Sequence, residues 1–238
     1  EIKEAVNVPV GTVTYMDPAH APDFFENALK DGKADFLIMN RPLTVDPEYV
    51  TKLKEGRLDE IAPCTRCMHC HFDVDKEGNT YEHCRVNACT QHAFRESMPE
   101  GFDLPAAETT KNVMVVGAGP AGMEAARIAA LRGHNVTLYE KKSSVGGMLE
   151  FASTVKGPHE NLDALRSYME KQLEVSGVKL VTEHEVDAAF IENEKPDALV
   201  LACGGLRDTL GMEGTENTSI VAIEDFPAAT IGENVVIV

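Results

Sequence analysis

The chain has 238 residues, a formal net charge of −17 and 43% hydrophobic residues, enough for one large domain or two modest ones. The acidic balance argues against nucleic acid or an anionic membrane surface as a partner, because both require basic patches. No apolar run approaches the roughly 20 residues needed to span a bilayer, and no signal-peptide pattern is present. We therefore expect a cytoplasmic protein.

Residues 1–60 alternate between strand and helix patterns. The predicted elements are strands at residues 8–13 and 34–39 and helices at residues 22–29 and 47–53. Asp46 is the expected N-cap of the second helix. Two strand–helix units cannot close a sheet by themselves, so this segment is expected to belong to a larger α/β domain.

Residues 61–108 lack apolar periodicity but hold five of the six cysteines. Such a segment cannot bury a core, so a metal centre is the simplest source of order. A Cx2Cx2Cx13C pattern is made by Cys64, Cys67, Cys70 and Cys84. Three closely spaced thiolates with one remote ligand are typical of iron–sulfur proteins, and we predict a [4Fe–4S] cluster on these four residues.

Two alternatives stay open for this cysteine-rich segment. The first is structural zinc, which prefers paired ligands. The histidines that would serve it are His69, His71, His83 and His92. The second concerns Cys89, which is expected to be a partly buried thiol outside the site, with replacement of Cys84 as the alternative. Disulfides are not expected, because five cysteines lie within 26 residues of a chain of cytoplasmic character.

A dinucleotide-binding fingerprint follows the cysteines. Gly117, Gly119 and Gly122 form a GxGxxG motif after the apolar residues 113–116, an expected strand that leads into a helix. The first glycine makes a tight turn, the second admits a pyrophosphate to backbone N–H groups, and the third allows close helix–strand packing. Glu140 ends the next expected strand, 18 residues after Gly122. Its carboxylate is positioned to bind a ribose hydroxyl and disfavours a 2′-phosphate.

FAD is the favoured dinucleotide. Pro120 and Ala121 fill the motif, and Gly146, Gly147 and Met148 follow downstream, which indicates FAD rather than NAD. The other predicted elements are helices at residues 122–131 and 161–175, strands at residues 135–139, 179–181 and 198–201, and a linker at residues 99–110. The chain ends on an apolar run at residues 234–238, from which we expect that both ends are truncated.

Two further residues follow predicted strands. Arg41 comes after the second strand; if that strand belongs to a barrel, Arg41 lies at its C-terminal mouth, where phosphates bind. An ordinary arginine near a helix start is the alternative. Cys203 follows the last predicted strand and is expected to be a packing residue.

Together these residues resemble the iron–sulfur flavoenzyme branch of the Old Yellow Enzyme superfamily, which includes 2,4-dienoyl-CoA reductase, 2-enoate reductase and trimethylamine dehydrogenase. The resemblance covers nearly the whole chain. Its segments are the last barrel strand at residues 32–48, the run into the cluster at 54–64, the fourth ligand at 84–87, the FAD domain at 115–140 and a nucleotide-contacting strand end at 201–204.

The resemblance implies an α/β architecture in three parts. Residues 1–60 would be the last two βα units of an FMN-binding TIM barrel, and residues 61–108 the cluster segment and linker. Residues 109–238 would be the first part of a Rossmann-like FAD-binding domain, which stops where an NAD(P) domain begins. No catalytic acid is named, because the strands that carry it in the family would precede Glu1.

The resemblance also implies the cofactor contacts. They are Gly117, Gly119, Pro120, Ala121, Gly122, Glu140, Lys141, Gly147, Met148, Cys203 and Gly204 for FAD, and Arg41 for the FMN phosphate. Asn40 and Thr14 stand where the family usually has glycine, and a Cβ at either position crowds the phosphate. Cys203 replaces the usual threonine.

The implied activity is NAD(P)H-dependent reduction of activated C=C bonds in an unsaturated acid or CoA ester, with electrons passing from FAD through the cluster to FMN. The isolated chain is expected to be inactive, and a homo-oligomer is compatible with this interpretation. One alternative is an amine dehydrogenase of the same architecture, and another is an electron-input module similar to the small subunit of glutamate synthase. A zinc-stapled nucleotide-binding scaffold is the non-enzymatic alternative.

Overall fold

The computed structural model describes residues 2–13, 17–72, 84–90 and 104–205, with 221, 229–230 and 232–233. The elements of the first part are α1 (Ile2–Ala5), β1 (Gly11–Val13), α2 (Pro22–Lys30), β2 (Phe36–Ile38), α3 (Arg41–Val45), α4 (Tyr49–Glu55) and the 3-10 turn η1 (Leu58–Glu60). Two short elements carry the described cysteine-rich residues, α5 (His69–Phe72) and η2 (Ala88–Thr90).

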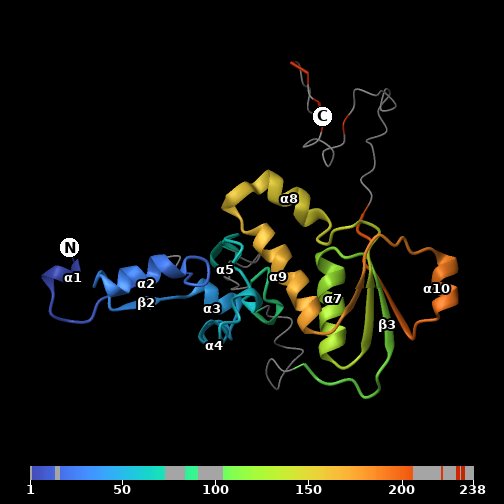
Figure 1. The fold of residues 1–238 in the computed structure, drawn as a ribbon, viewed down its shortest axis with the longest axis horizontal. Helices are drawn as coiled ribbons and strands as arrows, with labels where there is room; N and C mark the ends of the chain where they lie inside the picture. Colours follow the sequence, from blue (N-terminus) through green and yellow to red (C-terminus); the bar gives the residue numbers. More distant parts are fainter. Residues whose placement is uncertain are drawn as a thin grey trace, which may run out of the picture.

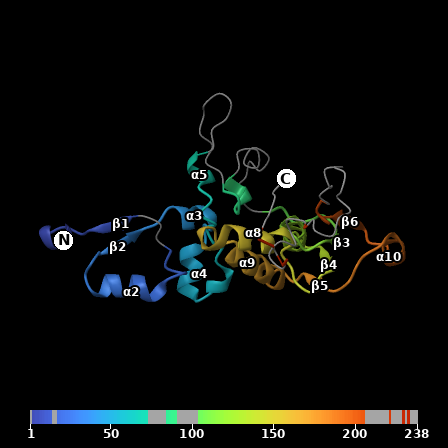
Figure 2. The ribbon, with the colours of Figure 1, turned by 90° about the horizontal axis from the view of Figure 1, so that it is seen from above.

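The last part is a parallel α/β unit. Its elements are β3 (Asn112–Val116), α7 (Pro120–Leu131), β4 (Asn135–Tyr139), α8 (Met148–Lys156), the 3-10 turn η3 (Gly157–His159), α9 (Leu162–Val175), β5 (Lys179–Val181), α10 (Ala188–Glu194) and β6 (Ala198–Leu201). Figure 1 shows α2 and β2 towards one end of the molecule and the sheet around β3 towards the other, with α3, α4 and α5 between them and α9 next to α7. The view from above gives the same order (Figure 2).

In the first part, β1 and β2 form a two-stranded parallel sheet, in which Gly11 pairs with Phe36 and Val13 with Ile38. Both strands are shorter than predicted, and the correction is largest for residues 8–13, of which only the last three are paired. Asp35 fixes the entry to β1, because its carboxylate accepts the N–H of Val10 at 2.6 Å. The parallel sheet agrees with the predicted strand–helix alternation, although two strands do not show a barrel.

The helix predicted at residues 47–53 is also corrected. It begins at Tyr49, after a separate short helix, α3, that the apolar pattern did not reveal. Asp46 ends α3 rather than capping α4, yet its carboxylate accepts the N–H of Glu48 at 3.0 Å, a local turn that leads into α4. Gly56 ends α4 in the left-handed conformation that glycine allows.

The sheet of the last part has the strand order β5-β4-β3-β6, parallel throughout. Three strand predictions match their residues, and α7 begins at Pro120, two residues before the predicted start. The predicted order of elements omitted α8 and α10. A core of apolar side chains lies between the sheet and its helices, formed by Val113, Val115, Ala118, Met123, Ala126, Val136, Leu138, Val145, Leu173 and Val178.

The strand order has a consequence for ligand binding. From β3 the chain builds outward to β4 and β5, then returns to place β6 on the opposite side of β3. Ligands of open parallel sheets bind at such a reversal, outside the carboxyl ends of the strands. The carboxyl end of β3 is therefore the expected ligand edge, and the GxGxxG motif begins there.

Several predictions fall on residues that the structure does not describe. The strand at 234–238, the family comparison at Thr14, and the part of the linker before residue 104 lie outside the described residues. Residues 104–110, which complete that linker, have no helix or strand. No helix among the described residues is long and apolar enough to cross a membrane.

Candidate functional site

The glycine turn joins β3 to α7. At two of its positions, the surrounding protein backbone leaves no room for a side chain. Gly117 has φ of +99°, and a Cβ there would lie 2.4 Å from the carbonyl oxygen of Ala202. A Cβ on Gly122 would lie 1.8 Å from the carbonyl oxygen of Gly117. Neither position tolerates a side chain, so both expected roles, the tight turn and the close packing, agree with the geometry.

Gly119 differs from its two partners. It is the residue before the first turn of α7, and its backbone is extended, with φ of −74°. No protein atom of the described residues lies within 4 Å of where its Cβ would stand. The open space lies at the N-terminus of a 12-residue helix, where exposed N–H groups and the helix dipole favour an anion. This is the space that a dinucleotide pyrophosphate would occupy.

Glu140 lies at the carboxyl end of β4 and is 9% exposed. Its Oε2 accepts the N–H of Ala118 at 2.7 Å, and its Oε1 accepts the N–H of Lys142 at 2.9 Å. The carboxylate thus holds the glycine turn to the end of the neighbouring strand. Sequence reasoning assigned Glu140 to a ribose and missed this second role, which depends on a backbone N–H that no motif identifies. Lys141, the adjacent predicted contact, is exposed.

Gly146 and Gly147 form a second turn beside the first. The N–H of Gly146 donates to the carbonyl of Ala118 at 2.8 Å. Gly147 has φ of +51°, and a Cβ there would lie 3.1 Å from the Cα of Gly119. The predicted contact Gly147 therefore lies against the glycine turn, and the predicted contact Met148 is exposed at the start of α8.

Cys203 and Gly204 follow β6 at the same edge of the sheet. Cys203 is exposed, so the prediction of a packing residue is wrong; its sulfur lies 3.7 Å from the carbonyl oxygen of Val116. The reason is that β6 is the outer strand of the described sheet. Cys203 lies close to Gly117, because a Cβ on Gly117 would be 3.1 Å from the Cα of Cys203.

The four predicted ligands line one small hollow. Its lining residues are Arg41, Thr44, Val45, Cys64, Thr65, Cys67, Met68, Cys70 and Cys84. Cys64 and Cys84 are buried, and Cys67 and Cys70 are half-buried. Burial raises the pKa of the Cys70 thiol, and the charges of the other three cysteines raise it further. As they stand, the described residues contain no group of three or more side chains arranged to hold a metal ion. The four thiols therefore line the same hollow, but they are not arranged as metal ligands.

The backbone between the cysteines is unusual. Arg66 and Met68 both have positive φ, +58° and +62°, and neither is glycine. Each such residue costs about 1 kcal/mol or more, and such strain is concentrated at functional sites. Left-handed residues in alternation with ordinary ones turn successive N–H groups to one side and form a concave anion-binding surface. The backbone is thus shaped as if to surround an anionic group.

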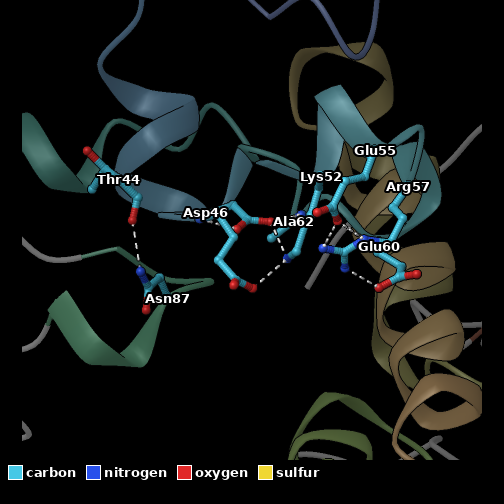
Figure 3. Close-up of polar contacts among 9 residues, drawn as sticks. Thr44, Asp46, Lys52, Glu55, Arg57, Glu60, Ala62 and Asn87 are labelled. Carbon is cyan, nitrogen blue, oxygen red and sulfur yellow. Dashed lines mark hydrogen bonds and ion pairs between the residues drawn. The ribbon is translucent and has the colours of Figure 1, made fainter. Parts of the chain in front are cut away.

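Polar contacts clamp the cysteine segment from both sides. Figure 3 shows Asn87 donating to the carbonyl of Thr44 at 2.9 Å, which joins the loop after Cys84 to α3. On the opposite side, Asn161 at the start of α9 donates to the carbonyl of Cys64 at 3.1 Å. The hollow therefore lies between the first part of the chain and the four-stranded sheet of the last part.

A buried ion pair supports this clamp. Asp46 Oδ2 accepts the Lys52 ammonium at 2.8 Å and the N–H of Ala62 at 2.9 Å (Figure 3). Both charged side chains are at most 10% exposed. The pair holds α4 and the residues that lead into Cys64 in one arrangement, because a single carboxylate satisfies both. Sequence reasoning described Asp46 only as a helix cap.

Arg41 follows β2, as expected, and is the first residue of α3. Its Nη1 donates to the sulfur of Met68 at 3.1 Å, so Arg41 also lines the cysteine hollow. Cys89 is half-buried and is absent from the lining residues of the hollow. Burial raises the pKa of its thiol, with the Arg127 charge acting in the opposite direction.

The histidine candidates are only partly described. His69, which lies within the cysteine triplet, forms a hydrogen bond with Arg85, the residue after Cys84. The side chains of the other three, His71, His83 and His92, lie outside the described residues. No histidine is among the described residues that line the hollow. All six cysteines lie in the described part of the chain, and none forms a disulfide, as expected.

Comparison with known proteins gives the family. Residues 111–238 match the family described as pyridine nucleotide-disulphide oxidoreductase. The chain belongs to this family. Membership implies FAD and NAD(P)H as cofactors, in agreement with the FAD prediction at the glycine turn.

Similar proteins match nearly the whole chain. An NADH oxidase of Thermoanaerobacter brockii is 37% identical over 97% of this chain and 34% of its own length. A cinnamate reductase of Clostridium sporogenes is 32% identical over 100% of this chain and 34% of its own length. A solved structure of 2-naphthoyl-CoA reductase with 2-naphthoyl-CoA has a TM-score of 0.79 at 30% identity, over 97% of this chain and 34% of that one.

These relatives confirm the resemblance to the iron–sulfur flavoenzyme branch. The matched regions include the first part and the cysteine segment as well as the sheet, because 97% or more of this chain is covered in each. The chain spans about a third of the length of the curated relatives it matches.

Proposed function

We propose that this chain belongs to a longer NAD(P)H-dependent flavin oxidoreductase that reduces activated C=C bonds in unsaturated acids or their CoA esters. The substrate class is supported by the names of two relatives, a cinnamate reductase and a 2-naphthoyl-CoA reductase. The residues of this chain would bind and connect the redox groups, while substrate contacts would lie elsewhere in the longer protein.

The glycine turn would bind FAD. Gly119 leaves room for the pyrophosphate at the N-terminus of α7, and the Gly146–Gly147 turn closes one side of that space. Glu140 would accept a ribose hydroxyl with the lone pairs that its two backbone contacts leave available. Pro120, Ala121, Lys141, Met148, Cys203 and Gly204 are proposed contacts around the same edge.

The four cysteines would hold a [4Fe–4S] cluster. Four thiolates are the usual ligand set of such a cluster, which supplies one-electron transfer when bound. The strained residues Arg66 and Met68 support an anionic occupant, because the N–H groups of such a backbone stabilise negative charge. Zinc is disfavoured, because no histidine is among the described lining residues and the three clustered cysteines are not paired knuckles.

The observation that carries the proposal is the position of this hollow. Asn161 joins Cys64 to the start of α9 in the last part of the chain, and Asn87 joins the Cys84 loop to α3. A redox group held there would stand between FAD on one side and a flavin of the first part on the other. An electron relay needs that intermediate position, whereas a purely structural zinc site does not.

The first part would be the end of an FMN-binding TIM barrel. Its strands expose apolar side chains that further strands would cover: Val13 is 61% exposed, Phe36 47% and Ile38 44%. Arg41 lies after β2, at the carboxyl end where a barrel binds phosphate, and would contact the FMN phosphate with its guanidinium near Met68. Asn40 would crowd that phosphate more than a glycine would.

Anaerobic turnover of the complete protein with NADH and cinnamate tests the proposal. We expect NADH to be consumed in step with cinnamate, and we expect Cys67→Ser to retain FAD but lose cinnamate reduction. Cys89→Ser is the matched control and should keep the parent rate, because Cys89 is not among the lining residues of the hollow. Oxidation of a secondary amine with no reaction of cinnamate would contradict the proposal in favour of an amine dehydrogenase.

A further inference from the structure

Arg166 on α9 has an unusual environment. Its Nε is buried and has no hydrogen-bond partner among the described residues. Leaving a guanidinium N–H unpaired away from water is costly, and folded proteins rarely leave such groups unsatisfied. A buried donor of this kind indicates that an acceptor is missing from the protein atoms alone.

The position of Arg166 indicates where that acceptor belongs. Its side-chain stem lies on Gly146: a Cβ at Gly146 would be 2.6 Å from the Cδ of Arg166 and 2.9 Å from its Cγ. Gly146 is bonded to the carbonyl of Ala118, and the next residue, Gly147, packs against Gly119. Arg166 therefore stands directly behind the turn that borders the open space at α7.

The missing side chain of Gly146 has a specific use in this arrangement. Its φ of +113° requires glycine, and the absent Cβ leaves the space that the Arg166 stem fills. The Gly146 turn thus places the Arg166 cation near the exposed N–H groups at the N-terminus of α7. Arginine matches phosphate oxygens in geometry and charge, and a chain of net charge −17 needs a local cation to hold an anion.

We propose that Arg166 binds the phosphate groups of FAD from α9, and that Gly146 holds the arginine in that position. The inference rests on the proposed FAD site and adds to it a residue that the fingerprint does not contain. The GxGxxG motif supplies backbone donors, and Arg166 supplies the positive charge.

The test is the FAD dissociation constant of the complete protein, measured by titrating FAD into protein freed of flavin. Arg166→Met keeps the length of the stem and removes the charge, and should weaken FAD binding about 10- to 100-fold, the loss expected for a charge-assisted hydrogen bond. Gly146→Ala should also weaken binding, because its Cβ displaces Arg166. Lys171→Met is the matched control on the same helix: Lys171 pairs with Asp59 and Glu174, and its loss should leave FAD binding unchanged.

The outcomes separate this inference from the site on which it rests. If Gly119→Val removes FAD while a folded Arg166→Met binds it with full affinity, the inference is overturned and the FAD site stands. If Gly119→Val also binds FAD fully, the FAD site itself is wrong. Should Arg166→Met not fold, Arg166→Gln decides: it removes the charge but keeps a polar side chain, so weaker FAD binding supports the inference and unchanged binding overturns it.

Discussion

The Glu140 carboxylate accepts the backbone N–H of Ala118 at 2.7 Å, a contact between residues 22 positions apart. Ala118 lies between the first two glycines of the fingerprint, and Glu140 lies at the end of the adjacent strand. The acid thus fixes the turn at which we propose that FAD binds. This explains why a carboxylate at this position is almost fully buried.

Replacing Glu140 by Ala should lower the free energy of unfolding by about 1–3 kcal/mol, because two buried N–H groups lose their acceptor. Glu140→Gln keeps a carbonyl oxygen for one of them and should lose roughly half as much. Urea unfolding of the flavin-free protein measures both. An alanine variant as stable as the parent would show that the contact contributes nothing to the turn.

Gly119 and Gly122 should respond differently to the same substitution. Gly119→Ala meets no described protein atom within 4 Å, so we expect unchanged stability of the flavin-free protein and a loss of FAD binding of tenfold or more. Gly122→Ala would place its Cβ 1.8 Å from the carbonyl oxygen of Gly117, and should destabilise the fold by several kcal/mol. Thermal unfolding without FAD, together with an FAD titration, separates the two. Equal behaviour of both variants would contradict the assignment of Gly119 to the ligand.

Met68 offers a test of the strained cysteine loop. Its φ of +62° suits glycine and strongly disfavours a β-branched residue. We expect Met68→Gly to retain iron and Met68→Val to lose it, with Met68→Leu close to the parent because leucine is unbranched at Cβ. Iron content after incubation with a chelator is the measurement. Retention of iron by all three variants would mean that the left-handed conformation is not needed.

A pair formed by a buried carboxylate and an exposed imidazole in the first part should make stability depend on pH. His20 Nδ1 lies 3.0 Å from Asp17 Oδ2, and the Tyr49 hydroxyl donates to the same carboxylate at 2.6 Å. The hydrogen bond to Asp17 raises the pKa of His20 above 6.5. Burial opposes ionisation of Asp17, but the hydrogen bonds from His20 and Tyr49 outweigh it and lower its pKa below 3.8.

The stabilisation from His20 is fully present below pH 6.5 and is lost as the pH rises through its raised pKa. That from Asp17 is present above pH 3.8 and is lost as the pH falls through its lowered pKa. We therefore expect the pair to stabilise most between these values, by about 0.5–1 kcal/mol given the partial exposure of His20. Unfolding at pH 5.5 and 8.5 should show this loss in the parent and not in His20→Gln; equal losses in both would exclude the pair as the cause.

The sequence was most informative where local rules dominate. The glycine motif predicted its turn because Gly117 and Gly122 each meet a local steric demand. Strands β4, β5 and β6 match their predicted residues because short apolar runs between turn signals mark strands. The cysteine spacing likewise selected four residues that the structure brings to one hollow.

Contacts between distant residues could not be predicted in this way. The Asn161–Cys64 hydrogen bond joins positions 97 residues apart. The role proposed for Arg166 depends on its packing against Gly146, which the sequence does not show. The exposure of Cys203 depends on its strand being at the edge of the described sheet. Helix α8 was missed because its residues bury no apolar face.

The central claim is that the four cysteines hold an iron–sulfur cluster between two flavin sites, and its most direct test is the metal content of anaerobically purified protein. We predict about four iron and four acid-labile sulfide per chain, lost on changing Cys64, Cys67, Cys70 or Cys84 to Ser and retained in Cys89→Ser. One zinc per chain, with no iron after anaerobic reconstitution, would contradict the account.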